Sequence, residues 1–320
     1  MMPYLFKVGN FELRIYSLMI ILALVITIFM AKRKVVRLGF KPEIIENMVI
    51  VIFVAAIIGA RIYYVIFQWD HYKDNPIEIF AIWHGGLAIH GGIIMGFFAA
   101  LIYSYYLKIR VMFFGDIIAP WLILGQGLGR IGNFANGEAH GVPVITPPEI
   151  IFQIKPIFTD FWQTTLNTFN ISHNPESIST LAAVAKNGAE VAFNDKIYIL
   201  KEYVPWGISF SSKFMPAAYQ DFGNLAVHPT FFYEMTLNFL SAAFMYYFWR
   251  QDKYISTGII FGMYLVFYGF IRGFVTMFRA DDLMLGFMRA PHVASLAFII
   301  IGLYLIIRGQ KILKQEQTVQ

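Results

Sequence analysis

A group of polar and ionisable side chains interrupts a stretch of sequence that is otherwise apolar. Residues 129–141, with the sequence GRIGNFANGEAHG, follow directly on the apolar run 117–128, and Arg61 and Arg272 also lie within apolar runs. Ionisable groups at membrane depth are costly unless they face partners, water or a ligand, so they mark function by default. Arginine keeps its charge and presents a planar fork of donors that suits phosphate. The pattern therefore indicates an anionic ligand, and in a bilayer the obvious anion is a lipid phosphate.

The composition is that of an integral membrane protein. The chain is 58% hydrophobic and 14% charged, whereas soluble domains average about 25% charged residues. Seven apolar segments approach the length of roughly 17–25 residues that spans a bilayer as a helix. We therefore expect an all-α protein with about seven transmembrane helices, forming one membrane domain over residues 1–320. The predicted segments are 15–31, 44–67, 86–107, 115–129, 229–249, 258–278 and 291–308.

The distribution of lysine and arginine predicts the orientation of these segments. Positive residues gather after the first, third, fifth and seventh segments, including the cluster Lys32-Arg33-Lys34. By the positive-inside rule the N-terminus is then outside and the C-terminus cytoplasmic. The polar region 142–227 is expected to form a small mixed head on the outer face. The fourth segment is short and contains Pro120 and two glycines, which favours a tilted or broken helix.

Several functional classes find little support in the sequence. There are no cysteines, which excludes disulfides and a cysteine nucleophile on the protein. The motif G-x-G-x-x-G at 127–132 trails a membrane segment and lacks the soluble βαβ context of a dinucleotide site. The seven histidines show no metal-ligand spacing, and no G-x-S-x-G elbow is present. We therefore expect no metal and no organic cofactor. We also expect no nucleic-acid partner, because no basic face exists outside the loops.

Individual polar residues have structural as well as functional interpretations. His90 lies among glycines that leave room for a ligand, but a buried imidazole bonded to a backbone carbonyl is the alternative. For Arg61 we favour a structural role, with the side chain snorkelling or paired with Glu46. Glu234 suits the positive end of the helix that begins near Pro229.

The motifs together resemble the prolipoprotein diacylglyceryl transferase family over nearly the whole chain. Residues 129–141 match the family signature, and His90-Gly91-Gly92, His228-Pro229-Thr230 with Tyr233-Glu234, and Arg279-x-Asp281 followed by residues 283–286 also resemble family motifs. Thr276 stands where the family usually has a glutamate one turn after Arg272. A carboxylate there would orient the arginine, which threonine cannot do at full strength.

The resemblance implies transfer of a diacylglyceryl group from phosphatidylglycerol to the lipobox cysteine of preprolipoproteins, with release of glycerol phosphate. This bacterial plasma-membrane reaction would take place toward the outer leaflet. His90 is the expected base or lipid-positioning group, and Arg130 and Arg272 the expected phosphate ligands. The other residues expected to bind substrate are Tyr16, Asn133, Asn136, Glu138, Tyr268 and Arg279.

Two alternatives remain open at this stage. The same inward arginines can form the selectivity site of a carrier or channel for an anion or an anionic lipid, although no internal repeat of the kind common in transporters stands out. Arg279 is either a second positive contact for the lipid or one half of a surface ion pair with Asp281. The oligomeric state is not determined by the sequence.

Overall fold

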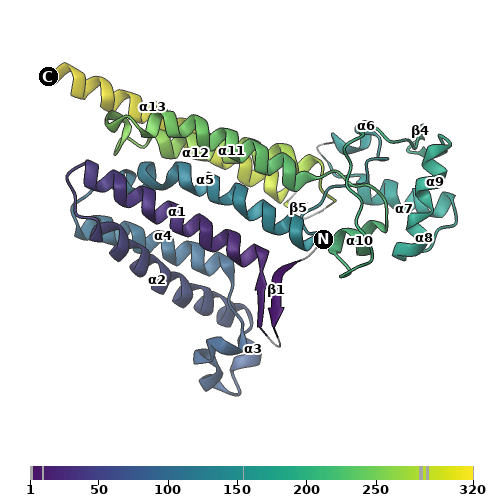
Figure 1. Ribbon diagram of the computed structural model, residues 1–320, viewed down its shortest axis with the longest axis horizontal. Coiled ribbons are helices and arrows are strands. Elements are labelled where there is room, and N and C mark those ends of the chain that lie inside the picture. The colour runs from purple at the N-terminus through teal and green to yellow at the C-terminus, as the bar shows by residue number, and fades with distance from the viewer. Residues whose placement is uncertain (1–2, 9–10, 154, 281–283, 286–287, 320) are drawn as a thin grey trace.

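Long helices dominate the computed structural model, which describes residues 3–8, 11–153, 155–280, 284–285 and 288–319. These helices form one elongated bundle, and a smaller group of short elements lies at one of its ends (Figure 1). The helices of 18 residues or more within the described chain are α1 (Ile15–Arg37), α2 (Glu43–Phe67), α4 (Ile89–Tyr106), α5 (Val111–Asn136), α11 (Thr230–Trp249), α12 (Ile259–Met277) and α13 (Ala290–Val319).

Six of these helices are long and apolar enough to cross a membrane, which makes the chain a multi-pass membrane protein. The segment predicted over 229–249 is the helix α11, but it is not among the six. Its hydropathy is lowered by Thr230, Glu234, Asn238 and Ser241, which recur at helical spacing and are all buried. This polar stripe lies inside the bundle, so the low hydropathy of α11 reflects its inward face rather than a loss of the helix.

Helix α5 differs from the broken segment that the sequence suggested. It runs without interruption over 26 residues and contains Pro120 in its interior. Most of the polar signature therefore lies on the helix itself, with Arg130 two turns before the end. The helix stops at Gly137, whose φ of +66° is left-handed and is easily adopted by glycine. The amide of Glu138 donates to the carbonyl of Asn133 at 2.9 Å and completes the turn.

Successive long helices alternate in direction, so particular helix ends meet at one end of the bundle. The starts of α1, α4, α11 and α13 lie there with the ends of α2, α5 and α12, beside the short elements of the head (Figure 1). This places the start of α4, which carries His90, at the same end as the last turns of α5. The C-terminus lies at the opposite end.

Residues 142–227 form a compact group of short helices around one two-stranded sheet. The buried residues Phe161, Leu166, Leu181 and Leu200 belong to a single apolar cluster that also includes Phe231 on α11. The strands β3 and β4 pair antiparallel, with Val191 opposite Tyr198. The elements are α6 (Pro148–Ile151), α7 (Phe158–Thr168), α8 (Pro175–Ser179), α9 (Leu181–Lys186), β3 (Glu190–Phe193), β4 (Lys196–Ile199) and α10 (Ala217–Phe222).

The chain segments that lead into and out of this head run side by side. The amide of Gly141 donates to the carbonyl of His228 at 2.9 Å, and the amide of His228 donates to the carbonyl of Val142 at 3.0 Å. The amide of Val144 continues the pairing to the carbonyl of Ala226 at 2.8 Å. A Cβ at Gly141 would lie 2.7 Å from the Cβ of His228, so the close pairing requires glycine at this position.

Two short hairpins each lie directly before the start of a long helix. The strands β1 (Tyr4–Val8) and β2 (Phe11–Arg14) pair antiparallel immediately before α1. The strands β5 (Met284–Leu285) and β6 (Met288–Arg289) pair in the same way before α13. Figure 1 shows the first hairpin extending from the head end of the bundle. Both hairpins therefore lie at the end of the bundle where α5, with the polar signature, also ends.

Arg61 has a structural role, as the sequence suggested, but its partners differ from the expected ones. Glu46 pairs with Lys32 instead, and Arg61 is buried and donates to the backbone carbonyls of Ile79, Gly85 and Gly86 at 2.7–2.9 Å. These carbonyls belong to the loop between α2 and α4, which contains α3 (Trp69–Tyr72) and two 3₁₀ turns, η1 (Pro76–Phe80) and η2 (Ile82–His84). Arg61 therefore fixes the irregular loop that leads to His90.

Helices α2 and α4 approach closely because both carry glycine where they cross. A Cβ at Gly91 would lie 2.2 Å from the backbone oxygen of Gly59, and one at Gly59 would lie 2.5 Å from the oxygen of Gly91. Backbone atoms on both sides leave no flexible group to move aside. Small residues of this kind let membrane helices pack at short range.

We expect Gly91→Leu to destabilise the protein by about 2 kcal/mol or more, because overpacking against fixed backbone forces the helices apart. Thermal unfolding in detergent measures the effect. Gly129→Ala is the matched control, since its added methyl group meets no atom within 4 Å. An unfolding midpoint for Gly91→Leu equal to that of the control would contradict the close α2–α4 packing.

Candidate active site

A buried carboxylate between two arginines forms the centre of the site. Arg130 on α5 donates from Nη2 to Oε1 of Glu234 at 2.6 Å. Nη1 of Arg272 on α12 lies 4.0 Å from Oε2 of the same carboxylate. The Glu234 side chain is 3% exposed, whereas those of Arg130 and Arg272 are 21% and 24% exposed. Glu234 thus joins three helices, and the cluster retains one positive charge that the carboxylate does not balance.

Asn133 fixes the second arm of the Arg130 guanidinium. Nη1 of Arg130 donates to Oδ1 of Asn133, one turn further along α5, at 2.9 Å. The two terminal nitrogens of Arg130 are therefore each held by one protein oxygen. A guanidinium fixed in this way can present its remaining N–H groups in a defined direction, as recognition of a phosphate requires.

The α12 face beside Arg272 carries two tyrosines at helical spacing. Tyr264, Tyr268 and Arg272 follow one another at intervals of four residues, and the two phenol rings stack with centroids 6.0 Å apart. Gln126, one turn before Arg130 on α5, donates to the Tyr264 hydroxyl at 2.9 Å. The polar faces of α5 and α12 are thus joined both here and at Glu234, and Tyr268 lies between the two connections.

Thr276 does not compensate for the missing glutamate one turn after Arg272. Its hydroxyl donates to the backbone carbonyl of Arg272 at 2.7 Å, which leaves the guanidinium untouched. The nearby carboxylate comes instead from Glu234 on another helix. Sequence reasoning gave Glu234 only a helix-end role. The signal that could have revealed its burial is the polar stripe at 230, 234, 238 and 241 in an otherwise apolar helix.

Tyr16, in the first turn of α1, packs directly against Gly132 of α5. A Cβ at Gly132 would lie 2.5 Å from the Tyr16 ring and 2.7 Å from its Cα, so glycine at 132 lets the first turn of α1 rest on α5. The Tyr16 side chain remains accessible, with the residue 37% exposed. It is therefore positioned beside the turn of α5 that carries Arg130 and Asn133.

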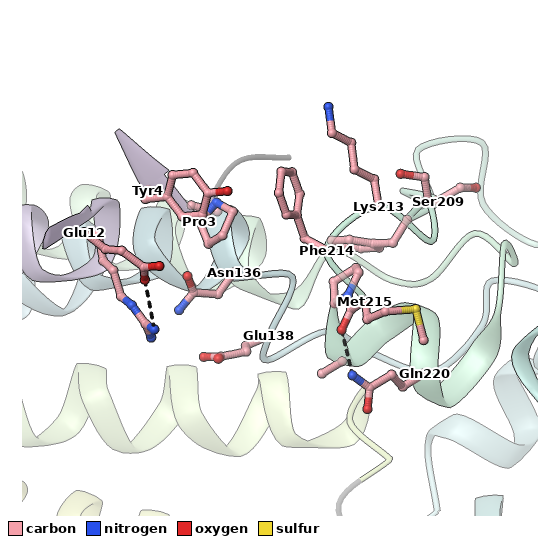
Figure 2. A pocket seen from close by; sticks show the side chains of 16 residues that line it. Pro3, Tyr4, Glu12, Asn136, Glu138, Ser209, Lys213, Phe214, Met215 and Gln220 are labelled. Atoms are coloured by element: carbon pink, nitrogen blue, oxygen red, sulfur yellow. Dashed lines mark hydrogen bonds and ion pairs between the residues drawn. The ribbon is translucent and has the colours of Figure 1, made fainter. Parts of the chain in front are cut away.

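Asn136 and Glu138 line a cavity that is distinct from the arginine cluster. This cavity has a volume of about 640 Å³ and lies between the β1–β2 hairpin and residues 209–220 of the head. Figure 2 shows the side chains of Asn136 and Glu138 between Tyr4 and Glu12 on one side and Phe214, Met215 and Gln220 on the other. The structure thus separates these two residues, which the sequence grouped with Asn133, from the guanidinium of Arg130.

His90 lies on a different helix pair from the arginine cluster. It is in the first turn of α4 and is exposed, and its ring stacks on Tyr63 of α2 with centroids 6.0 Å apart. Within the described chain, no hydrogen bond links His90 to Arg130 or Arg272. All three residues nevertheless lie toward the same end of the bundle. A substrate that contacts both His90 and the arginines must therefore lie across this end.

Arg279 follows the end of α12 and is partly buried. Its backbone carbonyl accepts from Nη1 of the buried Arg289 at 3.2 Å, and the same nitrogen donates to the carbonyl of Thr276 at 2.6 Å. Arg289 thereby ties the end of α12 to the β5–β6 hairpin. Asp281, Leu283 and Gly286 of the predicted motif lie outside the described residues.

The geometry defines a polytopic membrane protein with a cluster of two arginines and one glutamate at the head end of its helix bundle. Within the described residues no three histidine, aspartate or glutamate side chains lie close enough to hold a metal ion. The family model for prolipoprotein diacylglyceryl transferase matches residues 3–308. The chain therefore belongs to the prolipoprotein diacylglyceryl transferase family.

Bacterial relatives match the chain over nearly its whole length. The phosphatidylglycerol–prolipoprotein diacylglyceryl transferase of Fusobacterium nucleatum is 35% identical over 311 residues, covering 97% of this chain and 99% of the relative. The enzyme of the same name from Clostridium botulinum is 34% identical over 318 residues, which is 99% of each chain. That of Synechocystis is 31% identical and covers 94% of this chain and 86% of the relative.

We expect Glu234→Gln to lower the stability of the protein, because it leaves two guanidinium groups without a counter-charge. Removing one member of a buried ion pair costs about 3–5 kcal/mol. Thermal unfolding of Glu234→Gln, Arg130→Gln and the double variant forms a double-mutant cycle. The double variant is expected to lose less stability than the two single losses combined, by at least about 1 kcal/mol. Additive losses would show that the two side chains do not interact.

Proposed function

We propose that this protein transfers the diacylglyceryl group of phosphatidylglycerol to the lipobox cysteine of preprolipoproteins. The cysteine sulfur attacks the glyceryl carbon that carries the phosphate, a C–S thioether bond forms, and the C–O bond to the phosphate breaks. Glycerol phosphate leaves with the bonding electrons, and the thiol proton passes to a base. The observation that carries the proposal for this chain is the Arg130–Glu234–Arg272 cluster, within a chain of this family.

The arginine cluster supports the proposed binding of the phosphate. Negative charge grows on the phosphate oxygen as the C–O bond breaks, and fixed donors aimed at such charge lower the barrier. Arg130 is held by hydrogen bonds to Glu234 and Asn133, so its guanidinium need not reorganise during the reaction, and Arg272 lies 4.0 Å from the same carboxylate. The remaining positive charge favours an anionic headgroup.

The residues around the cluster can bind the rest of the headgroup. Tyr16 and Tyr268 lie beside the arginine-bearing turns of α5 and α12, where their hydroxyls can donate to the phosphate. Asn136 and Glu138 line the cavity of about 640 Å³ between the β1–β2 hairpin and residues 209–220, where they can bind the glycerol hydroxyls. Arg279, just beyond the end of α12, provides a further positive group at the head end of the bundle.

His90 is the proposed base for the thiol. A free cysteine has a pKa near 8.5, so only a few per cent is thiolate at pH 7 and activation is required. The exposed ring of His90 at the start of α4 is open to a peptide that reaches the head end of the bundle. The same position also suits a histidine that only positions the lipid, and the two roles differ in their effect on turnover.

The proposed setting is the bacterial plasma membrane. If α11 is counted with the six more apolar helices, the chain has seven spans. With the positive residues inside, this places the N-terminus outside and the C-terminus in the cytoplasm. Residues 142–227 then form an extracytoplasmic head within a single membrane domain over 1–320. This orientation brings the arginine cluster to the outer leaflet, where exported preprolipoproteins present their signal peptides.

The activity itself is tested with purified protein, phosphatidylglycerol and a lipobox peptide, with glycerol phosphate release as the readout. We expect release that depends on the peptide cysteine, because the sulfur is the nucleophile. The Cys→Ser peptide is the control. Lipid binding without release would favour a carrier of anionic lipid and would contradict the transferase.

We expect Arg130→Lys to lower the turnover number by about 10²–10³-fold, the loss typical of removing one preorganised donor to developing charge. A lysine keeps the positive charge but cannot bond Glu234, Asn133 and a phosphate with one planar fork. Lys32→Arg, at the opposite end of the bundle, is the control for conservative exchange. Full activity of Arg130→Lys would exclude a need for the bidentate geometry.

We expect His90→Gln to reduce turnover by about 10²-fold or more if the imidazole removes the thiol proton, within the usual range for general base catalysis. If His90 only positions the lipid, the KM for phosphatidylglycerol should rise while turnover changes little. Initial rates over a range of lipid concentrations distinguish the two roles. Wild-type values for both constants would remove His90 from the reaction.

A further inference from the structure

A second pocket lies on the side of the molecule where the head meets α11 and α12. It has a volume of about 600 Å³, within the range of small-molecule sites. Its rim includes Phe152 and Trp206 of the head and Phe274 of α12, which are 50%, 57% and 41% exposed. Large apolar side chains therefore surround the opening. None of the proposed catalytic or headgroup residues lines this pocket.

Two of the residues that line this apolar pocket carry a buried polar atom without a partner among the described residues. His228 and Thr146 both line it, and the residues are only 3% and 1% exposed. Within the described chain, Nε2 of His228 and the hydroxyl of Thr146 have no hydrogen-bond partner. A buried polar group without a partner costs about 1–3 kcal/mol. Two such groups in one apolar pocket indicate a ligand that brings hydrogen-bonding atoms with it.

A chain of hydrogen bonds favours one tautomer of His228. The indole of Trp206, which can only donate, donates from Nε1 to the Tyr233 hydroxyl at 2.7 Å. The Tyr233 hydroxyl lies 3.2 Å from Nδ1 of His228, and we infer that it donates its proton to that nitrogen. Burial lowers the pKa of His228 to about 4, so the ring is neutral at pH 7. Nε2 therefore carries the hydrogen and is an N–H donor.

We propose that this pocket binds one acyl chain of a glycerolipid, with the ester carbonyl accepting hydrogen bonds from Nε2 of His228 and the hydroxyl of Thr146. The assignment deepens the proposed function, on which it rests, by giving the diacylglyceryl group a binding site separate from its phosphate. The hydrocarbon lies against Phe152, Phe274 and Leu237. The Arg130–Glu234–Arg272 cluster, which does not line this pocket, holds the headgroup.

The position and chemistry of the pocket favour a lipid over a peptide. Tyr203, Trp206 and Tyr233 line it, and tyrosine and tryptophan concentrate at the level of the headgroups. The pocket continues along the first turns of α11 and past the exposed Thr236, so its opening faces the outside of the bundle. An ester brings acceptors without donors, which matches the free N–H of His228. A peptide would also bring N–H groups, and an N–H donor such as Nε2 of His228 cannot accept hydrogen bonds from them.

Photolabelling tests the proposal directly. The probe is phosphatidylglycerol with a diazirine in one acyl chain, incorporated into phosphatidylcholine vesicles that hold the full-length protein. Illumination followed by mass spectrometry is expected to place the label on peptides that contain Phe152, Trp206 or Phe274. Thr236→Trp narrows the pocket from its exposed rim and should reduce this labelling about tenfold, the equivalent of 1.4 kcal/mol. Leu240→Trp, one turn further along the same exposed face and outside the pocket, should leave it unchanged.

The hydrogen bonds have a readout of their own. With a ¹³C-labelled ester carbonyl, the infrared band of bound lipid should include a component at lower wavenumber, which Thr146→Val weakens and Thr146→Val with His228→Phe abolishes. Loss of one neutral hydrogen bond should weaken binding of the probe about fivefold. An ester band in the wild type identical to that of the double variant would exclude the assigned bonds.

The outcomes separate this inference from the proposed reaction. Pocket labelling without release of glycerol phosphate would support the lipid pocket and contradict the transferase. Cysteine-dependent release, with label spread evenly over the helices and insensitive to Thr236→Trp, would support the transferase and overturn the pocket. Labelling of the pocket by a photoreactive lipobox peptide instead of the lipid would also overturn the assignment.

Discussion

The buried carboxylate of Glu234 is the interaction on which the arrangement of the site depends. A charge in the interior of a membrane protein is tolerated only when it is paired, and here one carboxylate faces guanidinium groups from α5 and α12. The cost of burying this carboxylate and partly burying the two guanidinium groups is offset only if the helices hold them in register. The contact between Gln126 and Tyr264 supports the same register about one turn further into the bundle. The proposed substrate recognition and the helix packing therefore depend on the same contacts.

The site combines rigid and open parts. Arg130 is fixed by hydrogen bonds to Glu234 and Asn133, and Arg272 lies beside the same carboxylate, whereas His90 and Tyr16 are accessible on neighbouring helices. A headgroup bound by fixed donors needs little rearrangement of the protein, and this is the source of catalytic advantage in a preorganised site. The accessible residues face the space through which a second, larger substrate must approach. The division between fixed and accessible groups thus parallels the division between the two substrates of the proposed reaction.

The sequence predicted the residues whose chemistry is unusual for their surroundings and missed those whose roles depend on long-range packing. Arg130 and Arg272 were predicted because a charge inside an apolar run needs a reason. Glu234 was missed because a carboxylate near a helix start already has a local explanation. Arg61 was assigned the wrong partners, since the loop carbonyls that it binds follow no periodic pattern. Helix α5 was predicted to be short or broken because Pro120 and its glycines weaken the local helical signal, whereas packing against α1 and α11 stabilises one continuous helix.

The paired segments at the base of the head have an evolutionary consequence. Because Gly141 and Val142 are hydrogen-bonded to His228, the chain leaves α5 and returns to α11 through two adjacent points. The distance between these points does not depend on the length or shape of the residues enclosed between them, and lengthening a closed loop adds little entropic cost. Natural variation can therefore enlarge, shorten or replace most of the head without displacing α5 relative to α11. The shape of the head can diverge while the register of α5 and α11 stays constant.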